Sequence, residues 1–372
     1  MDLKNFTTLR VGGPATEFLA PPTCEQLISA ARAAWASGEE WLVLGGGSNM
    51  VVADEGFAGT VIRVVTRGIE RLPGAGVLLR VQAGEPWDGL VATTVQWGFS
   101  GIEALSGIPG TCGAAPIQNI GAYGQELAST LRSIQFLDYL SGEVLVLTAD
   151  ELELGYRRSA LKGDRAGIVL SIDLALSAHP DAVSDPIEHA QLAQALRVVV
   201  GDRLPVAEVR AAVLVLRRSK GMVIDPADPD SVSAGSFFTN PIISAQFART
   251  LPADVPRWPV LVDPASASDV AEPTITALDS YDPHRLPRFP GAEPSAIKLS
   301  AAWLIEHSGV TRGFGLPGSA AVVSQKHSLA IVNTGGATAD QIAELARYIQ
   351  TRVLGAFGVL LQPEPVLVGV HI

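Results

Sequence analysis

Three positions combine residue types that could carry out chemistry. Arg157 and Arg158 follow a tyrosine and place two cations beside an apolar stretch, although a solvated basic face is the commoner origin of such a pair. Ser236 lies in residues 234–241, AGSFFTNP, where a glycine and two aromatic side chains flank a hydroxyl and could exclude water.

Glu364 stands between two prolines, in an apolar C-terminal segment that we expect to be the last strand. A carboxylate that is buried there needs a cationic partner or a proton, because burial penalises its charged form. The alternative is a residue at a strand edge that keeps its carboxylate in solvent.

Two glycine-rich segments could hold an anionic cofactor. Residues 106–124, SGIPGTCGAAPIQNIGAYG, contain five glycines and two prolines and predict neither helix nor strand. Residues 45–49, GGGSN, follow an expected strand at 41–44. Glycine permits turns with positive φ and close approach of the backbone, so that amide N–H groups can bind a pyrophosphate. Neither segment fits GxGxxG, so a Rossmann site is not indicated.

The remaining short motifs are treated as chance matches. Residues 313–318 match GxGxxG, but no strand is expected before them. Residues 159–162 and 295–298 both match SxxK of penicillin-binding serine enzymes, yet neither SDN nor KTG accompanies them. A serine hydrolase is therefore disfavoured.

Composition sets the broad class. The 372 residues are 47% hydrophobic and 17% charged, which predicts a globular protein of two or three domains. The net charge of −11 argues against a nucleic-acid-binding surface. Two cysteines, Cys24 and Cys112, make no disulfide framework, and no Cys/His spacing suggests a metal site. No signal peptide or membrane-spanning run is recognised, so we expect a soluble, cytoplasmic protein.

Helices and strands are mixed without strict βαβ alternation, which favours an α+β fold. A capping pair, Thr23 and Gln26, begins a helix expected over 23–37, and Thr338 with Gln341 caps a last helix. Residues 252–295 are rich in Pro, Asp, Ala and Ser and are expected to form a surface insertion. Further helices are expected at 86–97, 188–199, 207–217 and 299–307, and strands at 60–65, 77–82, 133–139, 143–148, 168–176, 320–323 and 329–332.

Taken in chain order, these pieces resemble the UDP-N-acetylenolpyruvoylglucosamine reductase family over nearly the whole sequence. The matching segments are 5–13 (NFTTLRVGG), 44–49 (LGGGSN), 107–124, 155–157 (GYR), 234–241 (AGSFFTNP), 298–305 (KLSAAWLI) and 362–365 (QPEP).

The resemblance implies a flavin-binding fold of the vanillyl-alcohol-oxidase type. Two FAD-binding subdomains would span 1–66 and 67–217, and a substrate-binding domain 218–372. The implied reaction is NADPH-dependent, FAD-mediated reduction of UDP-N-acetylglucosamine enolpyruvate to UDP-N-acetylmuramate. This step belongs to peptidoglycan synthesis, and so to cell-wall formation, cell shape and division. The enzyme is expected to be a monomer that holds FAD non-covalently.

The resemblance also implies the site residues. Arg157, Ser236 and Glu364 would be catalytic, and Lys220, Asn240 and Lys298 would bind substrate, with Lys220 at the anionic part of substrate or NADPH. The implied cofactor-binding residues are Arg10, Gly45, Gly46, Gly47, Ser48, Asn49, Gly110, Gly113, Ala114, Pro116, Gln118, Asn119, Gly121, Ala122 and Tyr123.

Three features depart from the family pattern. His189 lies near the position expected for a substrate-capping tyrosine, Cys112 lies in the cofactor loop, and the 252–295 insertion is long. Two other functions are also considered. One is a sugar or alcohol oxidase of the same flavin fold, and the other is a non-catalytic nucleotide-sugar-binding protein. The presence of Arg157, Ser236 and Glu364 together argues against both.

Overall fold

The computed structural model describes residues 1–74, 76–163, 165–260 and 296–372. The described chain divides into two compact units, each built from more than one segment. Unit 1 comprises Met1–Phe237, Thr311–Tyr348 and Pro363–Ile372, and unit 2 comprises Phe238–Val310 and Ile349–Gln362. The boundaries expected at residues 66 and 217 stay a prediction.

Unit 1 begins with a small parallel sheet of order β1-β4-β2. Helix α1, Cys24–Ala36, follows β1 and is capped by Thr23, whose Oγ1 accepts a hydrogen bond from Gln26 N at 3.3 Å. This confirms the predicted helix and its N-terminal cap. The three strands are β1 (Ala15–Leu19), β2 (Trp41–Leu44) and β4 (Phe57–Arg63), and a 3₁₀ turn, η1 (Leu3–Phe6), precedes them.

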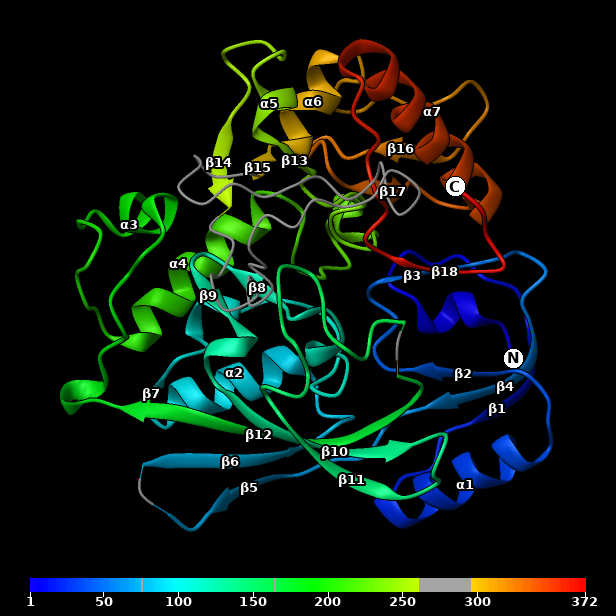
Figure 1. The fold of residues 1–372 in the computed structure, drawn as a ribbon, viewed down its shortest axis with the longest axis vertical. Coiled ribbons are helices and arrows are strands. Elements are labelled where there is room, and N and C mark those ends of the chain that lie inside the picture. Colours follow the sequence, from blue (N-terminus) through cyan, green and yellow to red (C-terminus); the bar gives the residue numbers. More distant parts are fainter. Residues whose placement is uncertain (75, 164, 261–295) are drawn as a thin grey trace, which may run out of the picture. The chain divides into compact units, whose positions relative to one another are not determined.

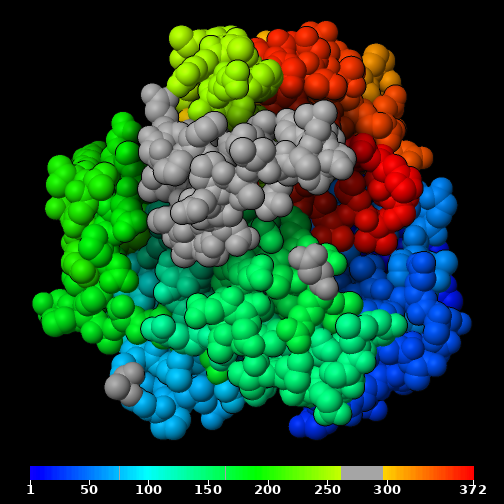
Figure 2. Space-filling view, viewed as in Figure 1, coloured from blue at the N-terminus to red at the C-terminus, as the bar shows by residue number. Residues whose placement is uncertain are grey.

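Unit 1 also contains a larger antiparallel sheet of order β11-β10-β12-β6-β5 (Figure 1). Helix α2, Trp87–Gln96, packs against this sheet through the buried side chains of Trp87 and Leu90. β11 is an edge strand, and its segment lies at the surface in the face drawn in Figure 2. The strands are β5 (Ile69–Leu72), β6 (Val77–Gln82), β10 (Leu131–Asp138), β11 (Val144–Thr148) and β12 (Gly167–Ala178), with β7 (Phe99–Ser100) beside β12.

Residues 106–124 are mostly irregular, but the prediction of no regular structure is wrong in two places. A 3₁₀ turn, η3, spans Ala115–Gln118, and a two-residue strand, β8 (Gly121–Ala122), pairs with β9 (Gln125–Glu126). Pro116, the second residue of the turn, has its φ already restricted, and Asn119 follows the turn in the left-handed region at φ +44°. The short turns η2 (Glu103–Leu105) and η4 (Leu127–Ser129) flank this loop.

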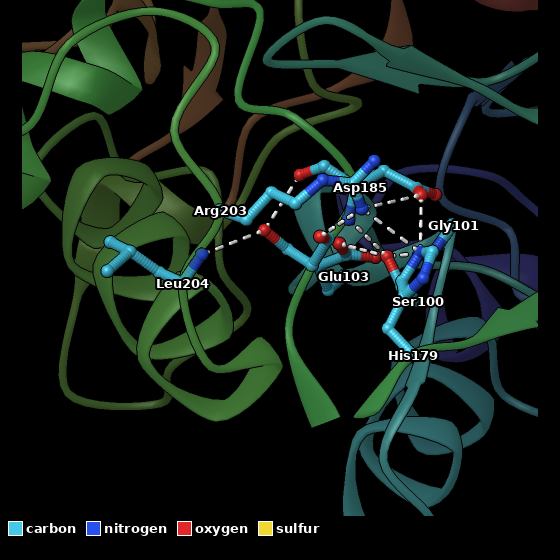
Figure 3. Close-up of polar contacts among 8 residues, drawn as sticks. Ser100, Gly101, Glu103, His179, Asp185, Arg203 and Leu204 are labelled. Atoms are coloured by element: carbon cyan, nitrogen blue, oxygen red, sulfur yellow. Dashed lines mark hydrogen bonds and ion pairs between the residues drawn. The ribbon is translucent and has the colours of Figure 1, made fainter. Parts of the chain in front are cut away.

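The segment that connects β12 to helix α4 is fixed to the sheet by a polar cluster (Figure 3). The buried carboxylate of Glu103 accepts a hydrogen bond from Ser100 Oγ at 2.8 Å, and Ser100 Oγ accepts one from Asp185 N at 2.7 Å. Asp185 Oδ1 lies 2.7 Å from His179 Nε2 and 3.6 Å from Arg203 Nη1. These contacts position the connector, which contains η5 (Pro180–Ala182) and α3 (Ala190–Leu196) and leads to α4 (Val206–Arg218).

The C-terminal part of the chain returns to unit 1. β18, Val366–Val368, pairs in parallel with β3, Met50–Val52. Glu364 therefore lies before the last strand and not within it, because Pro365 lacks the N–H that a paired strand would donate. The other elements here are η6 (Pro229–Ser231), β16 (Ala321–Val323), β17 (Ile331–Asn333) and α7 (Ala339–Phe357), whose last residues belong to unit 2.

Unit 2 contains an antiparallel sheet of order β13-β15-β14. The expected insertion begins differently from the prediction, because Arg257–Val260 form β14 and pair with β15, Ala296–Leu299. Residues 261–295, the rest of that insertion, lie outside the described residues. The unit also contains β13 (Ile242–Ser244), α5 (Ala245–Ala248) and α6 (Ala301–His307). No helix in the described ranges is both long and apolar enough to cross a membrane.

Candidate active site

Unit 1 holds a cavity of about 390 Å³, within the range of sites for small molecules. The two glycine-rich segments lie on its wall, together with Arg157, Ser236 and Glu364. Sequence positions more than 300 residues apart thus meet in one site, which the order of the chain alone does not show.

The two glycine segments contact each other so closely that side chains would not fit between them. A Cβ on Gly46 would lie 2.7 Å from Gly110 Cα, and a Cβ on Gly45 would lie 2.6 Å from Thr111 Oγ1. Gly110 itself has φ +111°, a conformation that other residues rarely adopt. The glycines are therefore needed to bring two stretches of backbone amides to one wall of the cavity.

Asn49 joins three segments of the chain at this wall. Its Nδ2 donates to Gln118 Oε1 at 2.8 Å and to the carbonyl oxygen of Glu364 at 3.2 Å. Its carbonyl oxygen accepts from Val366 N at 2.9 Å. The first glycine segment thus holds both the cofactor loop and the backbone that carries Glu364.

Arg157 and Glu364 form an ion pair, with Nε and Oε1 3.0 Å apart. The Nε–H does not point at an acceptor, so the contact is electrostatic more than a directed hydrogen bond. Arg157 Nη2 also donates to the carbonyl of Gly121 at 3.3 Å. The arginine occupies the left-handed region at φ +54°, in the tight turn between Gly155 and Arg158. Its backbone is strained where its guanidinium is presented, as is common at functional sites.

Burial governs the Glu364 carboxyl, which is 11% exposed. Desolvation raises the pKa of Glu364 above its ordinary value, and the positive charges of Arg157 and Lys162 oppose that rise. The prediction that this carboxylate is partly buried is confirmed, and its partner is Arg157. A carboxyl poised in this way can act as a proton donor when protonated or as a hydrogen-bond acceptor when ionised.

Ser236 is held by its neighbours more than by its own side chain. Gly235 has φ +76°, and Phe237, which is fully buried, donates its N–H to the carbonyl of Leu329 at 2.7 Å. The carbonyl of Phe237 in turn accepts from Glu364 N at 2.9 Å. Within the described residues the Ser236 hydroxyl makes no hydrogen bond, so it can meet a ligand.

The structure brings most of the expected site residues to the cavity, but not all. Asn119 lies beneath it, where Oδ1 accepts from Ala128 N at 2.9 Å and Nδ2 donates to the carbonyl of Gly155 at 3.1 Å. The residues on the wall are Gly45, Gly46, Gly47, Ser48, Asn49, Gly110, Gly113, Ala114, Gln118, Gly121, Arg157, Ser236 and Glu364. The expected site residues of unit 1 that do not lie on the wall are Arg10, Pro116, Asn119, Ala122, Tyr123 and Lys220.

Lys220 and Tyr123 belong to a neighbouring group of side chains. The Lys220 ammonium donates to Gln191 Oε1 at 3.1 Å and lies 5.6 Å from the Tyr123 ring centroid. The His189 ring lies edge-on to the same tyrosine, with 5.4 Å between centroids. Burial and the nearby Lys220 charge lower the pKa of His189. Asn240 and Lys298 belong to unit 2, where Asn240 Oδ1 accepts from Ala301 N at 3.0 Å.

Two cations on the cavity wall, Lys162 and Arg217, were not predicted as site residues. In the sequence, Lys162 is distinguished only by a chance SxxK match at residues 159–162. Arg217 lies in residues 217–220, RRSK, at the end of α4, and the adjacent Arg218 is exposed. Sequence alone carries no signal that separates these two adjacent arginines.

Comparison with known proteins shows the family to which the chain belongs. Residues 226–368 match the C-terminal domain of UDP-N-acetylenolpyruvoylglucosamine reductase, and residues 15–148 match an FAD binding domain. A UDP-N-acetylenolpyruvoylglucosamine reductase of Leifsonia xyli subsp. xyli is 57% identical over 99% of this chain and 98% of its own length. The chain belongs to the UDP-N-acetylenolpyruvoylglucosamine reductase family.

Further relatives agree with this membership. The reductase of Saccharopolyspora erythraea is 46% identical over 98% of this chain and 94% of its own length. The crystal structure of the Thermus caldophilus reductase matches with a TM-score of 0.63 and 26% identity, covering 99% of this chain and 97% of that one. The expected α+β flavin-binding fold is confirmed.

The cavity fits FAD, the cofactor of this family. Its glycine wall offers closely packed backbone amides of the kind that bind a pyrophosphate, and the Ser48 side chain lies among them. Cys112 is fully buried beside this wall, and burial raises the pKa of its thiol far above the ordinary value. The chain is an FAD-dependent oxidoreductase, and the thiol within its cofactor loop is shielded from solvent and little ionised.

Proposed function

We propose that this protein uses NADPH to reduce the enolpyruvyl ether of UDP-N-acetylglucosamine enolpyruvate, which gives UDP-N-acetylmuramate for peptidoglycan synthesis. One observation carries the proposal: the ion pair of Arg157 and Glu364, 3.0 Å apart, lines the same cavity as Ser236. A cation, a buried carboxyl and a hydroxyl are the groups that this reduction needs.

Bound in this cavity, FAD would supply the terminal carbon of the enolpyruvyl group with a hydride equivalent that originates from the nicotinamide. Addition of a hydride there leaves negative charge on the carbon that bears the ether oxygen, delocalised into the carboxylate. Arg157 is placed to stabilise this charge by a preorganised electrostatic interaction. The carbonyl contact to Gly121 holds its guanidinium in place before substrate arrives.

Glu364 and Ser236 complete the reaction at the charged carbon. Glu364 in its protonated form donates a hydrogen bond to the developing enolate, and burial favours that form. Ser236 gives a proton to the carbon itself as general acid. The buried Phe237 beside Ser236 excludes water, so the proton comes from a positioned donor.

Four further assignments remain proposals. Lys220, Asn240 and Lys298 bind the substrate, and the glycine-wall residues named above bind FAD. We also propose that the enzyme works as a monomer in the cytoplasm. Sedimentation at micromolar concentration would test whether the enzyme is a monomer. Fractionation of the source cell would test whether it lies in the cytoplasm.

An anaerobic titration tests the function. NADPH should bleach the yellow oxidised enzyme, and the enolpyruvyl substrate should then restore the colour without oxygen. A sugar or alcohol oxidase would recover colour only with oxygen, and a non-catalytic binding protein would show neither change.

A further inference from the structure

Arg217 presents an uncompensated positive charge at the cavity. It lies in the last turn of α4 (Val206–Arg218), and its Nη2 donates to the carbonyl of Met222 at 2.9 Å. Its Nε is buried and has no hydrogen-bond partner. The residue as a whole is half-buried, but a donor that is shielded from water and unused is costly unless a ligand completes it.

Asp88 is a carboxylate whose negative charge acts on Arg217, but its oxygens are already engaged by other groups. Asp88 binds Arg210 through both oxygens, at 2.6 and 3.0 Å, and Oδ1 also accepts from Gly107 N at 2.6 Å. Arg217 makes no ion pair with any residue in the described part of the chain. Burial lowers the pKa of Arg217 to about 10, so it remains charged at neutral pH.

The ionisable side chains on the cavity wall carry an excess of positive charge. Among the described residues of the wall, Arg157, Lys162 and Arg217 are accompanied by one carboxyl, that of Glu364. Because Arg157 already pairs with Glu364, no carboxyl of the described wall remains for Arg217, and its charge is available to an anionic ligand. Lys220, by contrast, is not on the wall and is occupied by Gln191.

We propose that Arg217 is a binding residue for the anionic group of the ligand that enters beside FAD. That group is a phosphate of NADPH, or the carboxylate or diphosphate of the enolpyruvyl substrate. The inference rests on the proposed function, since it takes the identity of both ligands from there. Arginine suits this task because its planar fork can donate two hydrogen bonds to a carboxylate or phosphate.

The test compares Arg217→Gln and Arg217→Lys with a matched control, Arg218→Gln. The control removes a charge from the adjacent, exposed residue of the same helical turn. Each variant is purified with its FAD, and NADP⁺ and the enolpyruvyl substrate are titrated into the oxidised enzyme while the flavin spectrum is recorded. Rapid-mixing measurements of bleaching and recolouring then give the half-saturating concentrations.

Arg217→Gln should keep its FAD and weaken at least one ligand by about ten- to hundredfold, the range for a lost charged hydrogen bond. Arg217→Lys should recover part of that loss, and Arg218→Gln should bind as the parent does. Weaker NADP⁺ binding would identify a nucleotide phosphate as the partner. Weaker substrate binding would identify the substrate's own anion.

Two results would overturn the proposal. If Arg217→Gln and Arg217→Lys bind both ligands as tightly as the parent, the arginine serves only to hold Met222. If both variants lose FAD while keeping the parental melting temperature, the arginine serves the cofactor instead. Failure of the proposed function would appear differently, as a parent enzyme that NADPH does not bleach or that substrate does not recolour.

Discussion

The chemistry assigned to the cavity depends on the protonation of Glu364. Its pKa is raised by burial and held back by Arg157 and Lys162, so the protonated form persists to higher pH than in a free carboxyl. The protonated fraction falls as pH rises through that pKa. The substrate half-reaction should therefore slow with rising pH.

Glu364→Gln tests this dependence because the amide keeps a hydrogen-bond donor but cannot titrate. We expect its recolouring rate, followed by rapid mixing at pH values from 5 to 9, to lose the decline that the parent shows. Glu364→Ala should instead be slow at every pH, by about 10²–10⁴-fold, the usual contribution of a positioned acid. An amide variant that retains the parental pH profile would assign the titration to another group.

The cofactor loop contains a thiol that could in principle attach to flavin. Cys112 is fully buried, and burial raises its pKa, so very little thiolate forms at neutral pH. We predict that FAD is bound non-covalently and that acid precipitation leaves the yellow colour in the supernatant. Colour in the washed protein pellet would contradict this.

At the scale of elements, we predict that the contact between the two glycine segments shapes the binding site for FAD. Gly46→Ala would place a Cβ 2.7 Å from Gly110 Cα, where only backbone could move away. Overpacking of this kind costs about 1–3 kcal/mol, so FAD affinity should fall by about ten- to hundredfold.

Gly355→Ala is the matched control for this change. Gly355 lies in α7, and a Cβ there would meet no atom within 4 Å. Its FAD content, measured from the ratio of flavin to protein absorbance, should equal that of the parent, and its melting temperature should not fall. Equal loss of FAD in both variants would refute the steric account.

Elements with a strong local signal could be predicted from sequence. The Thr23 cap and the following apolar face define α1, and the alternating burial of β6 matches its predicted range of 77–82. The sequence did not indicate strands whose formation depends on pairing with a strand that is distant in the chain. β3 is only three residues long and forms because β18 pairs with it. β14 lies in a proline-rich stretch that does not indicate a strand, and it forms because β15 pairs with it.

The site divides in the same way. Residue types and the family resemblance indicate Arg157, Ser236 and Glu364, because a cation, a hydroxyl and a carboxyl suit the reaction. They do not indicate Arg217, since an arginine in a basic helix end has the same local sequence whether it is buried or solvated. Burial and the absence of a partner are properties of the folded unit alone.

At the scale of the whole molecule, the described residues on either side of 261–295 are neighbours. Val260 and Ala296 are directly paired across the antiparallel strands β14 and β15. A short Asn-Gly turn can therefore replace the segment, provided that 257–260 and 296–299 are kept. We predict that this shortened chain folds, holds FAD and turns over within about a few-fold of the parent, as expected for surface loops.

Steady-state kinetics and FAD content measure that prediction. A loss of turnover of about a hundredfold with FAD retained would correspond to ~2.7 kcal/mol of transition-state stabilisation. Such a loss would show that the segment helps to build the active site.

The central claim is that Ser236 donates a proton in the second half-reaction and has no part in the first. Bleaching by NADPH needs no proton donor to a substrate carbon, whereas reduction of the enolpyruvyl group does. Rapid-mixing absorbance on Ser236→Ala, without oxygen, measures both steps in one preparation. We predict bleaching at near the parental rate and recolouring slowed by about 10²–10⁴-fold, with partial recovery in Ser236→Cys. Equal slowing of both steps in an alanine variant that retains its FAD would contradict the assignment.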